Sequence, residues 1–335
     1  MPEQVLFTPA ALDQPWGQQI YQRVQSFGLP IQELRQNRIT GLRGETERQT
    51  YAIAKRTLAV VTAPQSQLKL TPIPPSADWQ FHLAEGCPAH CQYCYLAGSL
   101  SGPPVIRVYA NLPQILENLS AYERSGSPTT YEVSCYTDPL EIEHLTGSLA
   151  AAIRYFGTRQ DGHLRWVSKF DHVEGLLDLP HNGHTRCRVS VNAAPISDRL
   201  EGGTASVPAR LQGLRRLGLE GGYRLGVVIA PIMPIEDWRS HYTQLLDQIS
   251  TALDFESDLS FELISYRFTP GSKDVLLSWY PNTKLDLNEA NRVVKRNRFG
   301  GIKYVYDPKT MRELRQFFEQ ELAKRFPPAK LLYWT

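Results

Sequence analysis

The chain has 335 residues, 42% of them hydrophobic and 21% charged, so it is a globular protein that can bury a large core. It contains no apolar run of about 18 residues that could span a bilayer, and its net charge of +2 is too small to indicate a nucleic-acid partner by itself. The first residues lack the basic and apolar parts of a secretion signal, so we expect a cytoplasmic protein with no membrane partner.

The first segment, residues 1–76, is expected to be an N-terminal extension that packs on the main domain. A helix is predicted over 16–27, a basic polar stretch follows over 35–56, and TLAVVTA (57–63) predicts a short strand. Prolines then mark the end of the segment. No chemical motif stands out in it.

The main domain, residues 77–335, alternates short apolar runs with amphipathic stretches, which is typical of about six β-α units around a parallel sheet. We therefore expect an α/β fold, a full or partial (β/α)6-type barrel, with its chemistry at the carboxyl ends of the strands. The predicted strands cover 79–85, 130–136, 164–170, 185–192, 223–232 and 259–268. The predicted helices include 112–124, 141–156, 207–218 and 236–253.

A cysteine motif follows the first of these strands. In EGCPAHCQYCYLAG, the spacing C-x3-C-x2-C joins Cys87, Cys91 and Cys94. A [4Fe-4S] cluster held by three thiolates keeps one iron open, and S-adenosylmethionine can bind there and be cleaved into a radical. Tyr93, the aromatic residue between the last two cysteines, completes the pattern. We predict both cofactors from this motif, since strand, loop and an expected following helix provide its context.

Other interpretations of the cysteines remain open at this point. A structural zinc site is one, with His90 or His82 as the fourth ligand. Incidental buried cysteines are another. A disulfide framework fits poorly, because the chain has 5 cysteines, an odd number, and a reducing compartment suits that count better.

Several longer motifs carry a specific resemblance. GCPAHCQYCYL, IRVYANL, SCYTD, HLTGSL, LRWVSKFDHVEGLLD, HNGHTRCRVSVN, LGVVIAPI, FELISYRFT, YPNTKLDL and GIKYVY extend over nearly the whole chain from about Pro9 onward. Together they resemble the spore photoproduct lyase family. The resemblance implies a radical S-adenosylmethionine enzyme with a partial (β/α) barrel, which reverses a UV-induced thymine dimer in DNA. UV-damaged DNA is then the expected partner.

The resemblance also implies a hydrogen donor, Cys135, which gives its hydrogen atom to the product radical, with Tyr95, alone or together with Tyr93, returning hydrogen to it. Alternation along the strand would place Tyr131, Val133 and Cys135 on one face, aimed at the barrel mouth. A thiol suits the role because its S–H bond is weak and it must stay protonated. The alternative is a small buried core residue.

Contacts to S-adenosylmethionine are implied in the same way for Thr137, Lys169, Ser190 and Ala230. An ammonium can pair with the ligand carboxylate, and hydroxyls can bind its polar groups. Lys169 could equally be a solvated loop lysine. By contrast, Cys187 shares its strand face with apolar residues, so we interpret it as a packing residue.

A basic stretch, residues 292–309, holds six basic residues against one acidic residue, with aromatic residues between them. Cations neutralise phosphates and rings support unstacked bases, although such a stretch is often only a solvated helix face. A Gly-Gly pair favours a hairpin. The resemblance implies that this C-terminal basic hairpin binds the lesion, with contacts expected from Arg267, Arg298, Phe299, Lys303 and Tyr304.

The sequence departs from the family near the lesion. Tyr136 and Thr137 follow the donor cysteine where members commonly have Thr-Ser, and Phe299 replaces a tyrosine. The substrate is therefore expected to be the spore photoproduct or another dipyrimidine lesion, such as a (6-4) or Dewar product. A radical enzyme with a non-DNA substrate and a zinc-containing nucleic-acid-binding module remain alternatives. Flavodoxin or ferredoxin is the expected reductant.

Overall fold

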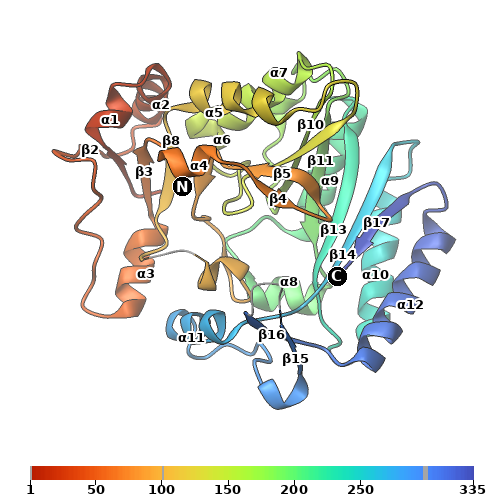
Figure 1. Ribbon diagram of the computed structural model, residues 1–335. Coiled ribbons are helices and arrows are strands. Elements are labelled where there is room, and N and C mark those ends of the chain that lie inside the picture. The colour runs from red at the N-terminus through yellow and green to blue at the C-terminus, as the bar shows by residue number, and fades with distance from the viewer. Residues whose placement is uncertain (1, 100–101, 297–300) are drawn as a thin grey trace.

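The computed structural model describes residues 2–99, 102–296 and 301–335. Its larger sheet is an eight-stranded, curled half-barrel (Figure 1). The strands run in the order β17 (Lys330–Trp334), β14 (Leu259–Ser265), β13 (Arg224–Ile232), β11 (Thr185–Val191), β10 (Gly162–Ser168), β9 (Thr129–Val133), β5 (Ala77–Phe81) and β4 (Thr71–Ile73).

The expected partial barrel is confirmed, and the strands β5, β9, β10, β11, β13 and β14 overlap the predicted apolar runs. The predicted strand 79–85 is wrong at its end, because β5 stops at Phe81 and Ala84–Glu85 belongs to a different sheet. From β5 to β14 all neighbours are parallel and follow chain order. Two edge strands extend the sheet: β17 lies parallel to β14, and β4 pairs antiparallel with β5.

Helices cover the outer face of this sheet. α7 packs on β10 and β11, and α9 packs on β11 and β13. Buried leucine, isoleucine and phenylalanine side chains fill the space between sheet and helices. The helices along this part of the chain are α4 (Gln65–Leu68), α5 (Leu112–Leu119), α6 (Glu143–Thr146), α7 (Ser148–Gly157), α8 (Ala194–Leu200), α9 (Val207–Leu219), α10 (Trp238–Ala252), α11 (Pro270–Trp279) and α12 (Pro308–Arg325).

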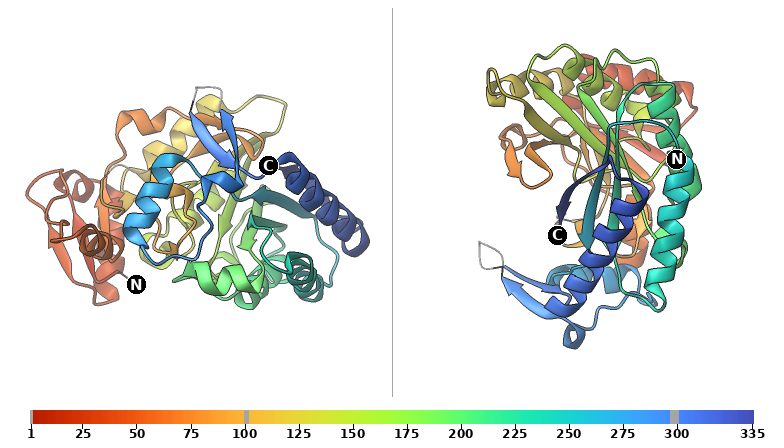
Figure 2. Two further views of the ribbon diagram at one scale, coloured as in Figure 1. Left: turned by 90° about the horizontal axis from the view of Figure 1, so that it is seen from below. Right: turned by 90° about the vertical axis from the view of Figure 1, so that its right-hand side faces the viewer.

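A second sheet lies beside the half-barrel, on the side away from α12 (Figure 2, left). Its strand order is β2 (Ile31–Glu33), β1 (Gln4–Phe7), β3 (Thr57–Val61), β8 (Ile106–Tyr109) and β6 (Ala84–Glu85). It is accompanied by α1 (Pro9–Leu12), α2 (Pro15–Ser26) and α3 (Glu47–Lys55) and has its own apolar cluster. After β5, the chain therefore returns to this sheet through β6 and β8 before it resumes the half-barrel.

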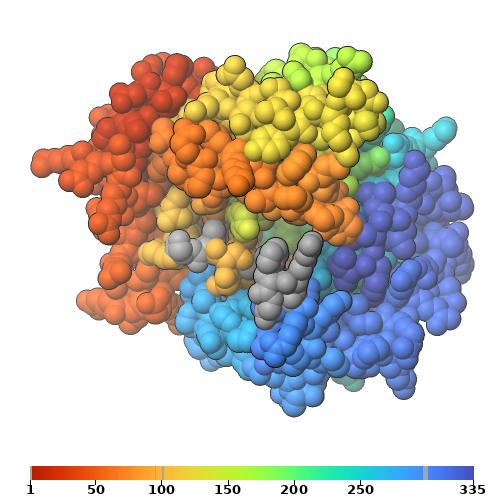
Figure 3. Space-filling view, viewed as in Figure 1, coloured from red at the N-terminus to blue at the C-terminus, as the bar shows by residue number. Residues whose placement is uncertain are grey.

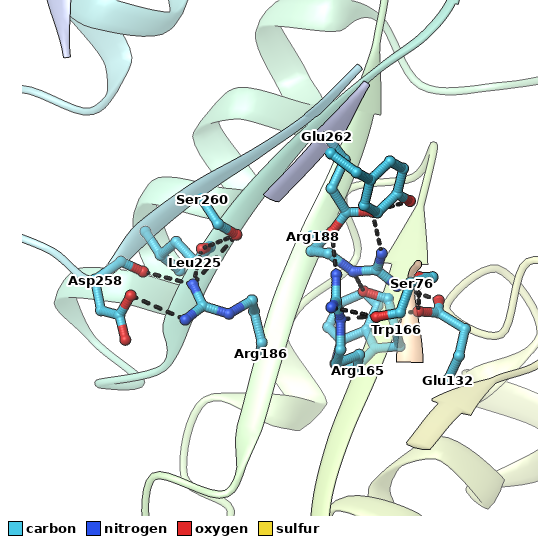
Figure 4. Close-up of polar contacts among 11 residues, drawn as sticks. Ser76, Glu132, Arg165, Trp166, Arg186, Arg188, Leu225, Asp258, Ser260 and Glu262 are labelled. Atoms are coloured by element: carbon cyan, nitrogen blue, oxygen red, sulfur yellow. Dashed lines mark hydrogen bonds and ion pairs between the residues drawn. The ribbon is translucent and has the colours of Figure 1, made fainter. Parts of the chain in front are cut away.

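The interior of the half-barrel is polar. Arg188 donates from Nη1 to Oε2 of Glu262 at 2.8 Å and also pairs with Glu132, while Arg165 pairs with Glu262. The hydroxyl of Tyr333 donates to Glu262 at 2.6 Å. These five side chains, which we call the interior network, come from five strands and meet inside the sheet (Figure 4). Each buried charge has an opposite partner, which offsets the cost of leaving water.

Two short ladders complete the described structure. β7 (His90–Cys91) pairs with β12 (Glu201–Gly202), and β15 (Val293–Arg296) pairs with β16 (Ile302–Val305). None of the helices in the described ranges is both long and apolar enough to cross a bilayer.

Candidate active site

The three motif cysteines lie in one loop, residues 86–94, which leaves β6 and passes through β7. Gly86 opens the loop with φ +82, and a Cβ there would stand 2.3 Å from the carbonyl oxygen of Val105, so a larger residue does not fit. The pairing of β7 with β12 sets Cys91 opposite Glu201. A 3-10 helix and then β8 follow the loop. The helix expected after the motif, over 112–124, is present as α5 but comes only after β8.

Side chains from α3 and from the end of α11 enclose this cysteine loop. The Tyr51 hydroxyl lies 2.9 Å from Nδ1 of His90 and also contacts the Tyr280 hydroxyl. The Lys55 ammonium donates to two backbone carbonyls of the loop. Burial raises the pKa of both tyrosines, so their hydroxyls stay protonated. The first segment, in which the sequence shows no motif, thus builds one wall of the loop.

Glu201 ties the cysteine loop to the half-barrel. Its fully buried carboxylate accepts from Nζ of Lys169 at 2.7 Å, lies 2.6 Å from Nη2 of Arg210, and accepts from the Tyr93 hydroxyl. Burial by itself would raise the pKa of Glu201, but the two cations bring it to about 2. This carboxylate is therefore ionised and holds Tyr93 by its hydroxyl.

The cysteine loop fits an iron-sulfur cluster. Cys87, Cys91 and Cys94 carry free thiols, and the charge of each would influence the others. No three His, Cys, Asp or Glu side chains in the described ranges converge closely enough for a single metal ion. Three thiols in one loop are the donor set that a [4Fe-4S] cluster with one open iron takes.

The residues expected to contact S-adenosylmethionine lie at the carboxyl ends of neighbouring strands. Ser190 is buried on β11, and Ala230 is half-buried on β13 where the register to β14 shifts. The Thr137 hydroxyl is buried and has no hydrogen-bond partner in the described part of the chain. That unsatisfied hydroxyl suits a polar ligand, since a buried polar group normally has a partner. The Lys169 ammonium is bound to Glu201 and is not a solvated loop group.

The strand-face argument for Cys135 is wrong. Tyr131 and Val133 point outward into the core under the helices, whereas Glu132 points inward to the interior network. β9 ends at Val133, and Ser134 adopts a left-handed conformation with φ 57. This turn breaks the alternation, so Cys135 does not continue the outward face. Parity cannot be carried past the end of a strand.

Cys135 itself is partly exposed at the end of β9. Burial raises the pKa of its thiol, and the nearby carboxylate of Glu132 raises it further, while Arg188 of the interior network opposes the rise. The thiol is therefore protonated and lies close to that network. Cys187, in contrast, is fully buried in the apolar core, as the strand pattern predicts.

The two motif tyrosines are placed differently. Tyr93 packs against the core with its hydroxyl on Glu201, and the Lys169 ammonium lies 5.5 Å from its ring centre. Tyr95 begins the 3-10 helix Tyr95–Gly98, and its side chain lies outside what the structure describes.

The basic stretch forms the predicted hairpin, β15–β16, and the hairpin is anchored to the end of β14. Tyr304 stacks on Phe268 with ring centres 5.2 Å apart, and its amide donates to the Phe268 carbonyl at 2.8 Å. Lys295 and Lys303 are cross-strand neighbours. Burial lowers the pKa of Lys303, and the charges of Arg267 and Lys295 lower it further. Three cations thus gather where the hairpin meets the half-barrel.

Two other residues of the stretch are held within the protein. Tyr306 is buried, and Arg292 stacks over its ring at 4.2 Å while pairing with Asp286 at 3.1 Å. Neither is among the residues expected to contact the lesion. Arg298 and Phe299 lie outside the described residues.

A hollow opens on the face seen in Figure 3, between the segment around β4 and β5 above and the α11 and hairpin segments below. Mid-chain residues, coloured yellow-green to green, are visible inside it. This hollow is the open side of the half-barrel, where the cysteine loop, the strand ends and the hairpin meet.

Sequence reasoning missed several residues that shape this site. Lys55, Glu201 and Arg210 are single charged residues in ordinary polar stretches, and nothing in their spacing distinguishes them. Asp138 accepts from Oγ of Ser168 at 2.8 Å and from the amide after it at 2.8 Å, so it joins the ends of β9 and β10. Only three-dimensional contacts identify these roles.

Comparisons with known proteins agree over the whole chain. A family model described as spore photoproduct lyase matches residues 1–335. A spore photoproduct lyase of Geobacillus sp. (strain Y412MC61) is 42% identical over 340 residues, which cover 100% of this chain and 99% of the relative. That of Bacillus subtilis (strain 168) is 37% identical over 340 residues, covering 100% and 98%.

Solved structures of spore photoproduct lyases also match over the whole chain. A spore photoproduct lyase complexed with dinucleoside spore photoproduct has a TM-score of 0.95 and 39% identity, covering 100% of this chain and 99% of the other. A spore photoproduct lyase variant with bound AdoMet and dinucleoside spore photoproduct gives the same TM-score of 0.95, identity of 39% and coverage of 100% and 99%.

Proposed function

Because the chain belongs to the spore photoproduct lyase family, we propose that it is a radical S-adenosylmethionine lyase that repairs the spore photoproduct in UV-damaged DNA. One observation carries this proposal most directly. A loop with three free thiols lies at the strand ends of a half-barrel whose whole length matches photoproduct lyases.

We assign the cluster ligands to Cys87, Cys91 and Cys94. When bound, the [4Fe-4S] cluster and S-adenosylmethionine supply the radical chemistry that opens the bond between the two damaged bases. The protein groups that hold the S-adenosylmethionine are those at the strand ends, Thr137, Lys169, Ser190 and Ala230. The Thr137 hydroxyl, which has no hydrogen-bond partner among the described residues, supports this assignment. The position of the four residues at the ends of neighbouring strands supports it as well.

Cys135 is the proposed hydrogen donor. Its S–H bond breaks as a C–H bond forms on the product radical, and the remaining thiyl radical receives a hydrogen atom from a tyrosine hydroxyl, Tyr95 or Tyr93. The tyrosyl radical left by that transfer would recover its hydrogen from 5′-deoxyadenosine, so that the cofactor is regenerated. The raised pKa of the thiol supports this role, because only the protonated form has a hydrogen atom to give. The Tyr93 hydroxyl already donates a hydrogen bond to ionised Glu201, so its hydrogen atom is less available for transfer. This favours Tyr95 as the residue that returns hydrogen.

The lesion is expected to lie over the hollow, with the damaged dinucleotide extruded from the duplex. Arg267, Lys303 and Tyr304 would contact it from the hairpin junction, together with Arg298 and Phe299. Clustered cations near a stacked ring support a site for phosphates beside bases.

Three wider features belong to the same proposal. We expect a flavodoxin or ferredoxin to supply the electron, and the cytoplasm, where free thiols persist, to be the compartment. We also treat residues 1–76 as an extension that packs on the 77–335 barrel. The wall that α3 builds around the cysteine loop supports that division of roles.

Anaerobic reconstitution followed by incubation with defined lesions tests the function. The protein should show the broad visible absorption of an iron-sulfur cluster and should restore thymines from the spore photoproduct, whereas Cys91→Ala should do neither. Repair of only a (6-4) or Dewar lesion would reassign the substrate. Cleavage of S-adenosylmethionine with no repair of any dipyrimidine lesion would refute the proposed function.

A further inference from the structure

A lysine of the N-terminal segment reaches the cysteine loop from outside the half-barrel. Lys55 is the last residue of α3, a helix that packs against α11 beside the loop. Its Nζ donates to the carbonyl oxygens of Cys87 and Ala89, so the ammonium lies against the backbone of a cluster ligand. The residue is only 9% exposed.

This ammonium has no carboxylate partner among the described residues, since no ion pair of that part of the chain includes Lys55. The contrast with Lys169 is informative, because Lys169 also lies near the loop but pairs with Glu201 at 2.7 Å. Burying a charge without an opposite charge is costly, and hydrogen bonds to carbonyls offset only part of that cost. A negative group is therefore expected beside Lys55.

The cluster that the three cysteines would hold is such a group. Nζ of Lys55 is hydrogen-bonded to the carbonyl oxygen of Cys87 itself and to that of Ala89, which lies between Cys87 and Cys91 in the loop. The ammonium therefore lies against the backbone that carries the cluster ligands. A cluster held by three thiolates carries a net negative charge in its oxidised form, and reduction by one electron adds another.

We propose that Lys55 is a positioning residue that acts through the cluster: its unpaired ammonium is the counter-charge of the reduced cluster and raises its reduction potential. The inference rests on the proposed function only in that the three cysteines hold a cluster. It gives the N-terminal segment a chemical role, which is to make the reducing electron easier to accept. Net charge and hydrogen bonding near the sulfurs are recognised determinants of such potentials.

Redox titration followed by electron paramagnetic resonance tests this, with dithionite as the reductant and no S-adenosylmethionine or DNA present. Lys55→Met should load iron but reach half-reduction at a more negative potential, with at least a tenfold lower ratio of reduced to oxidised cluster at a fixed potential, or about 59 mV for one electron. Lys55→Arg should keep the parent potential. Arg48→Met, the same loss of charge at an exposed position of α3, should also leave it unchanged.

Each other outcome decides against the inference. An unchanged potential in an iron-loaded Lys55→Met protein would overturn it. Lys55→Gln keeps a donor for the loop carbonyls but has no charge, so by the inference it should also load iron and shift the potential. Loss of iron from Lys55→Met alone, with Lys55→Gln loading iron at the parent potential, would show a purely structural role. Absence of any iron-sulfur signal in the parent protein would instead refute the proposed function.

Discussion

At the scale of single residues, the site depends on charges that are fixed by contacts distant in sequence. Glu201 is ionised because Lys169 and Arg210 surround it, and it holds Tyr93 in the cysteine motif. Cys135 is kept as a thiol by burial and by the neighbouring carboxylate of Glu132. These protonation states suit a radical reaction, in which hydrogen atoms are transferred and a nucleophilic thiolate could undergo side reactions.

The donor role makes a specific prediction. Cys135→Ala should still form 5′-deoxyadenosine from S-adenosylmethionine, but clean repair should fall to background because the product radical has no hydrogen donor and ends in side products. Chromatography of the products with mass detection measures both. Cys187→Ala is the matched control, since it removes a buried core thiol and should leave clean repair intact. Clean repair by the Cys135 variant would remove this residue from the mechanism.

His82 predicts a pH dependence of stability. Burial lowers its pKa to about 4, and its Nδ1 has no partner in the described ranges. The unfolded chain takes up this proton near pH 6.5, before the folded state does, so stability is lost as the pH falls from about 6.5 toward 4. Between about pH 7.5 and 5, the contribution of His82 to the free energy of unfolding should fall by on the order of 2 kcal/mol.

His82→Phe keeps the ring contact to Tyr136, whose ring centre lies 4.9 Å away, and removes the titrating group. Urea unfolding at the two pH values should therefore show a smaller drop in stability for this variant than for the parent protein. Equal drops would mean that His82 is already solvated or paired.

At the scale of elements, the sequence was a good guide where periodicity decides the structure. The alternation of arginines with apolar residues in TRCRVSVN predicts β11 with Cys187 as a packing residue, and Cys187 is buried in the core. The Gly-Gly pair in the sequence predicts the hairpin. β8 was missed, because IRVY is only four residues long and is paired with β3 and β6 in the other sheet. Its partners lie far away in sequence, so local pattern could not reveal it.

The hairpin carries its own prediction. Lys303→Ala should weaken binding of damaged DNA and reduce the slope of log affinity against log salt concentration by about one, because one phosphate contact is lost. Binding titrations at several salt concentrations measure the slope. Lys324→Ala, at an exposed position near the end of α12, should not change it. Identical slopes for the parent and the Lys303 variant would place the DNA elsewhere.

At the scale of the whole molecule, the interior network links the strands of the half-barrel across its inner face. Arg188 is 2% exposed and pairs with Glu132 and Glu262, which come from strands on either side of it. The sequence could predict that this arginine shares a face with other polar residues, but not that two carboxylates meet it. That arrangement depends on the curl of the sheet, which brings β9 and β14 toward each other (Figure 4).

Removal of the central cation should destabilise the whole fold. Arg188→Met removes the cation that two buried carboxylates share and leaves Arg165 as their remaining cation among the described residues, so the free energy of unfolding should fall by about 3–5 kcal/mol. Arg215→Met breaks an exposed pair with Asp254 and should cost no more than about 1 kcal/mol. Urea unfolding of both variants makes the comparison, and a similar small loss in both would show that water reaches the interior network.

Deuterium transfer to the repaired product is the decisive test of the proposed activity. Dinucleoside spore photoproduct is incubated without oxygen in D2O with the reconstituted, reduced protein and S-adenosylmethionine, and the products are analysed by mass spectrometry. The two thymines should be restored, and the product should carry deuterium delivered from the exchangeable thiol of Cys135. Unchanged photoproduct, while S-adenosylmethionine is being cleaved, would contradict the proposed activity.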